Sequence, residues 1–328
     1  MKKKSLYGIL SKEVKDMLTK IKNSYIAGLI IMLVAYALAI VSGIISYKGI
    51  NLENELLKFL IADIIGTVVI FIFSMIFRNS SIYDPYWSVA PMVMAPLFAH
   101  LTGGINPYEV LIVALIEVWG LRLTLNCLKR FKNLNTMDWR YIQYKEKYHK
   151  TWPLISLGGI HLVPTFVVFI AMLPVFSYMN TFDTGVVEVN ATLILSAGVC
   201  IFAIVIEMLA DLQMDKFKKT ANNPFGVNEI GLWKVSRHPN YFGEILFWFS
   251  MFLFSLSVNT NLWVLMFSPL VVFLLFVFIS IPMMEKRQLK NKSSYQEYIF
   301  RTNMLMPFFK PTEEEIKHKK NKFNKKTK

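Results

Sequence analysis

The sequence predicts an all-α membrane protein, a polytopic helical bundle of about eight transmembrane helices with both termini in the cytoplasm. Composition is the first reason. Of the 328 residues, 54% are hydrophobic and only 18% are charged, whereas soluble domains contain about 45–50% apolar and about 25% charged residues. Arrangement is the second reason, because the apolar residues gather in runs of about 20, the length that a helix needs to cross about 30 Å of hydrocarbon.

Eight apolar segments are expected to cross the membrane. Their approximate bounds are 25–47, 56–77, 87–101, 108–128, 154–178, 191–212, 241–257 and 262–284. The third segment is short and contains Pro91 and Pro96, so we expect it to be tilted, broken or partly re-entrant. Proline is tolerated in a membrane helix where neighbouring groups satisfy the freed backbone groups.

The positions of the basic residues predict the orientation. With the N-terminus inside, 33 of the 36 Lys and Arg residues fall in segments on the inner side, which are 1–24, 78–86, 129–150, 213–240 and 285–328. Short loops that are rich in Lys and Arg stay in the cytoplasm. Both termini are therefore predicted to be cytoplasmic, which requires an even number of spans.

The flanks of the predicted bundle have different compositions. Residues 1–24 place apolar side chains at helical spacing with lysines on the other face, which predicts an interfacial segment on the anionic inner leaflet. Residues 25–310 are expected to form a single transmembrane domain. Residues 311–328 are rich in lysine and poor in apolar residues, which predicts a disordered tail.

The net charge of +14 does not indicate a nucleic-acid partner, because the basic residues flank the apolar runs or lie at the ends of the chain. Cys127 and Cys200 both have apolar neighbours, so the sequence offers neither a disulfide framework nor the spacing of a metal site. Membrane lipids are the partners that this charge pattern predicts, in a multi-pass protein of the cell inner membrane or, in a eukaryote, of the endoplasmic reticulum.

Polar residues at the inner side of the predicted bundle mark candidate sites, because ionisable groups in spans are costly and usually functional. Tyr83, Asp84 and Tyr86 lie in an aromatic stretch at an inner boundary, where an interfacial aromatic belt is the competing interpretation. In the fourth span, Arg122 and Asn126 share a helical face. Snorkelling to the lipid headgroups explains Arg122 equally well.

A second group of polar residues follows the sixth and seventh spans. Glu207, Asp211 and Lys218 form a stripe at helical spacing, in which acidic groups suit ribose hydroxyls and the lysine suits a phosphate. The stretch 231–244 is the most specific signal. Its Ser-Arg-His sequence precedes Pro239, a favoured first helical residue, so the positive end of the seventh span is expected to form an anion site.

The stretch 231–244 resembles the hallmark of the steroid 5-alpha-reductase C-terminal-like superfamily, which includes sterol reductases. The aromatic stretch 83–91 is similar to an uncharacterised, largely microbial branch of that superfamily. The pattern Tyr295-Gln296-Glu297-Tyr298, with Met306-Pro307-Phe308-Phe309 after it, also fits. The resemblance covers about residues 80–310 and is strongest over 207–310.

The resemblance implies a membrane-embedded, NADPH-dependent reductase of activated carbon–carbon double bonds in a lipid-like substrate that is similar to a steroid, a sterol or a fatty acyl group. No glycine-rich turn of the Rossmann type is present, so the dinucleotide would be held among the last helices. The residues expected to bind it are Arg122, Asn126, Glu207, Asp211, Lys218, Trp233, Ser236, Arg237, His238, Asn240, Tyr241, Glu244, Arg287, Tyr295 and Tyr298.

Two residues are candidates for the acid that polarises the acceptor carbonyl, since the cofactor supplies the hydride chemistry and the protein supplies orientation and a proton. Glu117 lies in the fourth span, two turns deeper than Asn126, and Tyr86 lies at the start of the third. The carbonyl-binding Tyr that the steroid enzymes have on the middle helix is expected to be replaced here by Trp119.

Two other functions fit parts of the sequence. One is an S-adenosylmethionine-dependent methyltransferase of the isoprenylcysteine or phospholipid type, which shares the Arg-His-Pro-x-Tyr-x-Gly turn but is usually shorter. The other is a lipid-binding membrane protein without catalytic activity. Cofactor binding discriminates among the three, because fold analogy alone does not establish a function.

Overall fold

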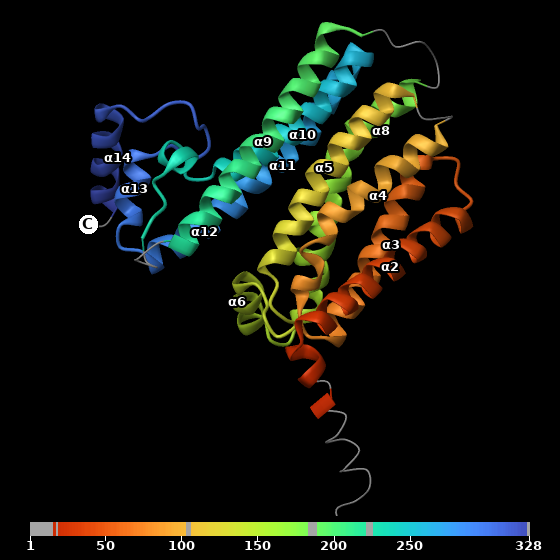
Figure 1. The fold of residues 1–328 in the computed structure, drawn as a ribbon, viewed down its shortest axis with the longest axis horizontal. Coiled ribbons are helices and arrows are strands. Elements are labelled where there is room, and N and C mark those ends of the chain that lie inside the picture. The colour runs from red at the N-terminus through yellow and green to blue at the C-terminus, as the bar shows by residue number, and fades with distance from the viewer. Residues whose placement is uncertain (1–15, 18, 103–105, 183–188, 221–225, 327–328) are drawn as a thin grey trace, which may run out of the picture. The chain divides into compact units, whose positions relative to one another are not determined.

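The computed structural model describes residues 16–17, 19–102, 106–182, 189–220 and 226–326. Helices dominate this part of the chain (Figure 1), and its only pairing of strand type is one isolated bridge between Ser236 and Asn303. The predicted all-α fold class is therefore confirmed. Most of the predicted interfacial segment lies outside the described residues.

Within the described residues, seven helical segments are long and apolar enough to cross a membrane, and they match seven of the eight predicted spans. They are α2 (Tyr25–Gly49), α3 (Glu55–Ile76), α5 (Pro107–Arg130), the segment Trp152–Thr181 that includes α8 (Val163–Phe182), α9 (Ala191–Thr220), α10 (Pro239–Val258) and the segment Thr260–Asn291. Within the last segment, η4 (Thr260–Met266), α11 (Phe267–Leu275), η5 (Phe276–Ser280) and α12 (Ile281–Asn291) follow one another. The protein is a multi-pass membrane protein.

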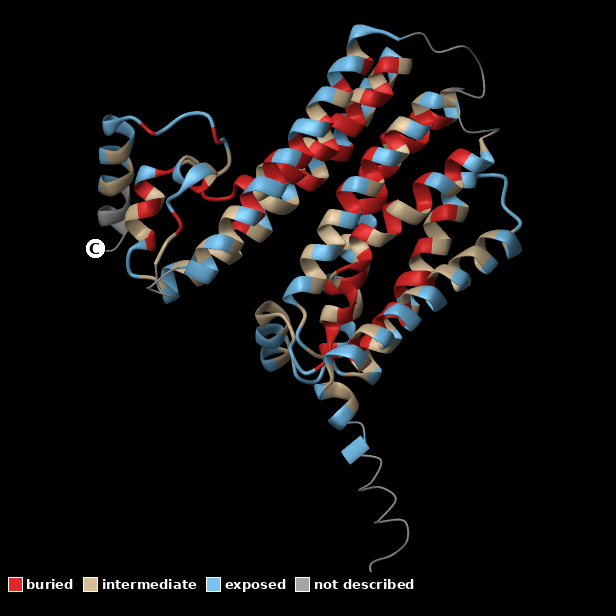
Figure 2. Ribbon diagram, in the orientation of Figure 1, coloured by how far each residue is buried: buried red, intermediate tan, exposed pale blue. Residues whose placement is uncertain are grey.

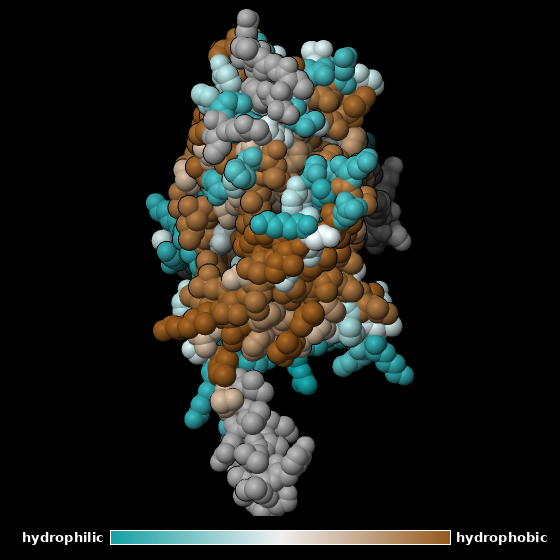
Figure 3. Space-filling view, turned by 90° about the vertical axis from the view of Figure 1, so that its right-hand side faces the viewer, coloured by the Kyte–Doolittle hydropathy of each residue, from teal (hydrophilic) through white to brown (hydrophobic). Residues whose placement is uncertain are grey.

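The outward faces of these helices are apolar, as lipid contact requires. On α2, for example, Ile26, Leu33 and Ile45 are each more than 60% exposed. Hydrophobic side chains form a broad band on the face shown in Figure 3. Buried residues follow the sides of the helices that pack together, as along α9 and α10 (Figure 2). Exposed apolar surface of this extent is typical of a membrane protein and not of a soluble one.

Where the sequence predicts one domain, the chain divides into two compact units. The first unit contains residues 1–101 and 116–169, and the second contains residues 102–115 and 170–328. Both α5 and α8 therefore contribute to each unit. The sites below are described within one unit at a time.

The third predicted span, α4 (Tyr86–Leu101), has 16 residues and contains both prolines, which makes it about 24 Å long at 1.5 Å per residue. Its start lies deep in the first unit, where Tyr86 donates a hydrogen bond to Asp63 in the middle of α3. Near its end, Phe98 packs against Phe59, in the first turns of α3, with ring centroids 5.4 Å apart. The short helix therefore begins inside the unit and ends level with the start of α3.

A short 3-10 helix, η1 (Ser80–Tyr83), leads into α4. Asn79 holds this turn, because its side-chain amide donates to the carbonyls of Leu134 and Thr136 at 2.9 and 3.1 Å. The chain thus returns from the end of α3 into the unit before α4 starts. This path explains why seven helices, and not eight, have the full spanning length.

The tail differs from the sequence prediction, because residues expected to be disordered form α14 (Glu313–Lys326). Its start is a capping box: the Thr312 amide donates to the Glu315 carboxylate at 2.9 Å, and the Glu315 amide donates to the Thr312 hydroxyl at 3.3 Å. Such reciprocal bonds satisfy the first free amides of a helix. Lys320 also contacts Glu297 on α13 (Tyr295–Arg301) at 2.9 Å.

We predict that single cysteines at Asn51 and Thr260, in a variant without the two native cysteines, react with an impermeant maleimide added outside intact cells. Cysteines at Asn135 and Lys234 should react only after permeabilisation, because these exposed positions lie on the predicted cytoplasmic side. Labelling of Asn51→Cys without labelling of Thr260→Cys would show that residues 80–101 do not cross the membrane.

Candidate functional site

The stretch before α10 forms a tight turn in the second unit. The 3-10 helix η3 (Gly231–Lys234) starts at Gly231, whose φ of 62° lies in the left-handed region that favours glycine. The Gln213 side chain on α9 accepts a hydrogen bond from the Leu232 amide at 2.8 Å. Pro239 is the first residue of α10, as predicted. Gly231 and Pro239 therefore favour the turn and the start of α10 locally, and Gln213 fastens the turn to α9.

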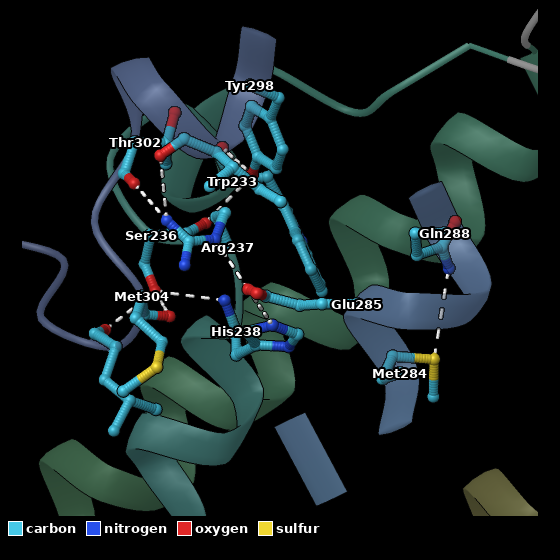
Figure 4. Close-up of polar contacts among 12 residues, drawn as sticks. Trp233, Ser236, Arg237, His238, Met284, Glu285, Gln288, Tyr298, Thr302 and Met304 are labelled. Atoms are coloured by element: carbon cyan, nitrogen blue, oxygen red, sulfur yellow. Dashed lines mark hydrogen bonds and ion pairs between the residues drawn. The ribbon is translucent and has the colours of Figure 1, made fainter. Parts of the chain in front are cut away.

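Arg237 is the centre of a buried polar cluster in this turn (Figure 4). Its Nε donates to Glu285 on α12 at 2.7 Å, and its Nη1 donates to the carbonyls of Ile299 and Thr302. Its backbone amide donates to the carbonyl of Asn303 at 2.8 Å. The arginine side chain is only 8% exposed. The guanidinium therefore joins α10, α12 and the end of α13 within the protein.

His238 belongs to the same cluster. Its Nε2 lies 3.1 Å from the Glu285 carboxylate, and its ring stacks on Tyr241 with centroids 5.3 Å apart. Burial lowers the pKa of His238, although the bond to Glu285 acts in the opposite direction. The Ser236 hydroxyl donates to the Leu305 carbonyl at 2.7 Å. The side chains predicted to form an anion site thus all have partners within the protein, which gives them a positioning role.

Two aromatic side chains hold the turn in place. The Tyr298 hydroxyl donates to the carbonyls of Trp233 and Ser236, and the Trp233 indole donates to the carbonyl of Ala210 on α9 at 2.9 Å. Tyr295 packs beside Tyr298, with ring centroids 5.6 Å apart. Burial raises the pKa of both phenols. These predicted cofactor residues anchor the turn to its neighbours.

Three carboxylates are buried where α9 and α10 meet. Glu207, Asp211 and Glu244 are 4%, 7% and 2% exposed, respectively. The helices approach closely at Gly243, where an added Cβ would lie 2.8 Å from the Glu207 Cβ. The Trp248 indole donates to Glu244 at 2.9 Å. The structure thus brings these predicted residues together. Buried acids in membrane helices are costly and usually functional, so this cluster is a candidate site.

Three further predicted residues of the second unit, two of them basic, are less deeply buried than the carboxylates. Lys218 is exposed near the C-terminal end of α9, whereas Arg287 on α12 and Asn240 in the first turn of α10 are half-buried. Lys292, which the sequence analysis did not single out, follows α12. Burial and the charge of Lys218 both lower the pKa of Lys292. Two lysines of this unit are therefore close enough for the charge of one to act on the other.

The first unit contains a second buried polar network, around Tyr83. Thr165 donates to the His161 carbonyl at 2.9 Å, so its oxygen accepts hydrogen bonds from Tyr83 and Thr67, each at 2.8 Å. His161 Nδ1 donates to the Ser156 carbonyl at 2.7 Å, which leaves Nε2, 3.0 Å from the Ser74 hydroxyl, as an acceptor. No motif in the sequence indicated this network, because its members come from three separate segments.

At the predicted cytoplasmic edge of the same unit, Asp84 accepts a hydrogen bond from Tyr141 at 2.6 Å. Burial raises the pKa of Asp84 to about 6, against the effects of Tyr141 and Arg140. Arg140 also pairs with Asp138 at 2.8 Å, one residue before α6 (Trp139–Lys147). These contacts fasten the loop after α5 to the start of α4.

The predicted residues of α5 lie in the first unit. Trp119 is fully buried and packs against Trp87, with ring centroids 6.1 Å apart. Glu117, Arg122 and Asn126 are half-buried. Gly120 lies close to α4, since an added Cβ would come within 3.0 Å of the Ser88 carbonyl. Trp119 therefore packs in the core of the first unit.

Tyr86 lines a cavity of about 440 Å³ within the first unit. The walls of this cavity come from α2, α3 and α4 and are mainly apolar, with Asp63 and Tyr86 among the lining residues. The Tyr86 hydroxyl donates to Asp63 Oδ1 at 3.1 Å. An added Cβ at Gly66 would lie 2.5 Å from the Tyr86 hydroxyl, so glycine makes room for the phenol. The sequence did not single out Asp63, because one acidic residue in an apolar run forms no motif.

We predict that Glu285→Gln destabilises the protein by about 3–5 kcal/mol, the cost of removing one partner of a buried ion pair. The neutral amide of this variant would leave the buried charge of Arg237 uncompensated. The thermal unfolding temperature of the purified protein in detergent should fall by several degrees. The control is Glu297→Gln, because Glu297 forms only an exposed pair. Equal unfolding temperatures for the two variants would contradict this role of Glu285.

Comparisons with known proteins identify the family of this chain. The family described as a protein of unknown function (DUF1295) matches residues 69–302. An uncharacterized protein of Schizosaccharomyces pombe, C594.04c, is 24% identical over 230 residues, which cover 63% of this chain and 65% of that protein. The chain thus spans just under two thirds of that relative's length. No solved structure matches the chain. Since the family match extends over more than half of the chain, this protein belongs to the DUF1295 family.

Proposed function

We propose that this protein is a membrane-embedded, NADPH-dependent reductase of an activated carbon–carbon double bond in a lipid-like substrate. One observation carries the proposal: an apolar cavity in the first unit contains a buried phenol, Tyr86, that is hydrogen-bonded to a buried acid, Asp63. The family is related to steroid reductases and to methyltransferases, which supports an enzyme over a lipid-binding protein without activity.

The cavity would bind the lipid-like substrate. Its walls include Ile40, Val93 and Leu97, and a mainly apolar pocket with a few polar groups is typical of a small-molecule site. With substrate bound, the Tyr86 hydroxyl would turn its single proton from Asp63 to a carbonyl conjugated to the double bond and donate its hydrogen bond there. In a site that excludes water, such a donor stabilises the negative charge that develops on the carbonyl oxygen.

Tyr86 is the better of the two predicted proton donors. It is 5% exposed, and Asp63 holds its hydroxyl within the cavity. Glu117 does not line this cavity. The pair of Tyr86 and Asp63 would therefore hold the proton at the Tyr86 oxygen, beside the bound carbonyl.

The second unit fits the cofactor. The charge of Lys218 acts on Lys292 at its predicted cytoplasmic end, where phosphate groups would relieve the repulsion between the lysines. The buried acids Asp211 and Glu244 would accept hydrogen bonds from hydroxyl or amide groups. NADPH, when bound, supplies a hydride. Arg237 and its partners hold the α10 start in the required place, and the resemblance to the steroid 5-alpha-reductase superfamily supports the same assignment.

A methyltransferase is the second candidate, and one observation favours it. The three buried carboxylates, Glu207, Asp211 and Glu244, would suit the positive sulfonium of S-adenosylmethionine. The lysine pair favours a phosphate-bearing ligand instead, since S-adenosylmethionine has no phosphate. Binding measurements with both cofactors therefore distinguish the two functions.

We predict that the purified protein binds NADPH more tightly than NADH or S-adenosylmethionine in a calorimetric titration. Charge-assisted hydrogen bonds to the additional phosphate contribute about 1.5–3 kcal/mol each, so NADH should bind at least about tenfold more weakly. Lys218→Ala and Lys292→Ala should both weaken NADPH binding, and the exposed Lys310→Ala should not. Tight binding of S-adenosylmethionine without binding of NADPH would favour the methyltransferase.

We predict that Tyr86→Phe lowers turnover by at least about 100-fold, the typical contribution of a general acid, and leaves NADPH affinity unchanged. Turnover would be followed as NADPH oxidation with a 4-ene-3-one steroid and a trans-2-enoic acid as probes. Glu117→Gln is the comparison variant. If Glu117→Gln abolishes turnover and Tyr86→Phe does not, Glu117 is the proton donor.

A further inference from the structure

The cavity of the first unit has two polar ends that are separated by apolar walls. Asp63 and Tyr86 lie at the buried end, and Lys48 and His100 lie at the exposed end, near the termini of α2 and α4. Along α4, the fourteen steps from Tyr86 to His100 correspond to about 21 Å at 1.5 Å per residue. This separation exceeds half of the roughly 30 Å hydrocarbon core, so one extended lipid chain can reach both ends.

The buried end lacks a hydrogen-bond donor. Asp63 is 6% exposed, and its Oδ1 accepts the bond from Tyr86. Its Oδ2 is buried and has no hydrogen-bond partner within the described part of the chain. A buried acceptor without a partner destabilises the folded protein. An occupant with a hydroxyl group at this depth would supply the missing donor.

The exposed end lacks an anion. Lys48 is exposed, and no acidic side chain of the described residues forms an ion pair with it. The acid nearest in sequence, Glu55, already pairs with Lys58 at 2.8 Å and accepts a hydrogen bond from Tyr47. His100 adds a second nitrogen group at the same end. An anionic head group is the complement of this pair.

The walls between the two ends determine the polarity and size of the part of the ligand that lies between them. They are formed by apolar side chains, of which Phe59, Met94 and Leu97 are examples. The volume of about 440 Å³ lies at the lower end of the range for small-molecule pockets. This space fits one hydrocarbon chain or a compact ring system, and it is too small for a membrane lipid with two chains.

We propose that this cavity binds an acidic single-chain or compact-ring amphiphile, with its anionic head group at Lys48 and His100 and a hydroxyl group that donates to Asp63. The inference rests on the proposed function in one respect, because it names the substrate class of the cavity assigned there. The amphiphile lies with its head group at the exposed end of the cavity and its reducible part near Tyr86. A carboxylate and a phosphate monoester present the same chemistry to Lys48.

Direct binding to the purified full-length protein in a non-ionic detergent tests this proposal, with no cofactor present. The probes are an ω-hydroxy long-chain fatty acid, its methyl ester, the unsubstituted fatty acid and a single-chain alkyl phosphate. We expect the methyl ester to bind at least about tenfold more weakly than the hydroxy acid, because it has lost the anion. If the alkyl phosphate binds as tightly as the acid, the proposal is supported, and an anionic lipid head group can supply the anion as well as a carboxylate can.

Two sets of variants locate the two ends. Lys48→Ala combined with His100→Ala should remove the difference between acid and ester. The control is Lys58→Ala, since Lys58 is paired with Glu55 and does not line the cavity. Asp63→Leu should weaken the hydroxy acid about tenfold and leave the unsubstituted acid unchanged. Because the acid and its ester are also compared on the unmodified protein, the test does not depend on the folding of any variant.

The outcomes separate this inference from the proposed function. Equal binding of acid and ester, with no effect of Lys48→Ala, would overturn the inference even if a neutral enone lipid is reduced with NADPH. Selective binding of the acids that depends on Lys48 supports the inference, even if no NADPH is consumed. In that case the proposed reductase activity fails and the binding site stands.

Discussion

The buried ion pair between Arg237 and Glu285 is the contact on which the second unit depends. A guanidinium inside a membrane protein is expensive unless its charge is compensated and its donors are used. Glu285 provides the compensation, and the backbone carbonyls of Ile299 and Thr302 accept further hydrogen bonds. This pairing brings the start of α10 against α12 and the end of α13, which lie more than 40 residues later in the sequence. The acids of α9 and α10 can then be held at a defined place.

In the first unit, the polar groups around His161 and Thr165 also have hydrogen-bond partners inside the protein, and these partners are uncharged. Backbone and side-chain polar groups that are removed from water need partners inside the protein. His161 provides such partners where the chain departs from regular α-helix, in the π-helical segment η2 (Ser156–Leu162), and Thr165 does so in the first turn of α8. The resulting network supports the turn of η1, from which Tyr86 enters the cavity. π-helical turns of this kind are frequent at functional sites.

The two units provide different chemistry. The second has buried carboxylates and two lysines whose charges act on each other, and it is the unit to which the proposal assigns the cofactor. The first has an apolar cavity with a phenol and an acid at its buried end and a lysine at its exposed end, which suit an amphiphile. The residues that the family resemblance singles out in the α10 turn are mostly occupied in holding that turn. The groups that remain available for ligands are fewer, and several of them, Asp63, Lys48 and Lys292, belong to no motif.

The sequence by itself determined the features that depend on neighbouring residues. Run length and composition were enough to locate the spanning helices, because crossing a bilayer is a requirement on one continuous segment. Pro239 marked the start of α10, since its ring favours the first helical turn. The capping box at Thr312 and Glu315 was equally local, and lysine-rich composition obscured it. The tertiary structure alone decided which polar groups meet. The pairing of Asp63 with Tyr86 and of Arg237 with Glu285 joins residues 23 and 48 positions apart, and no spacing rule relates such positions, because the packing of whole helices sets them side by side.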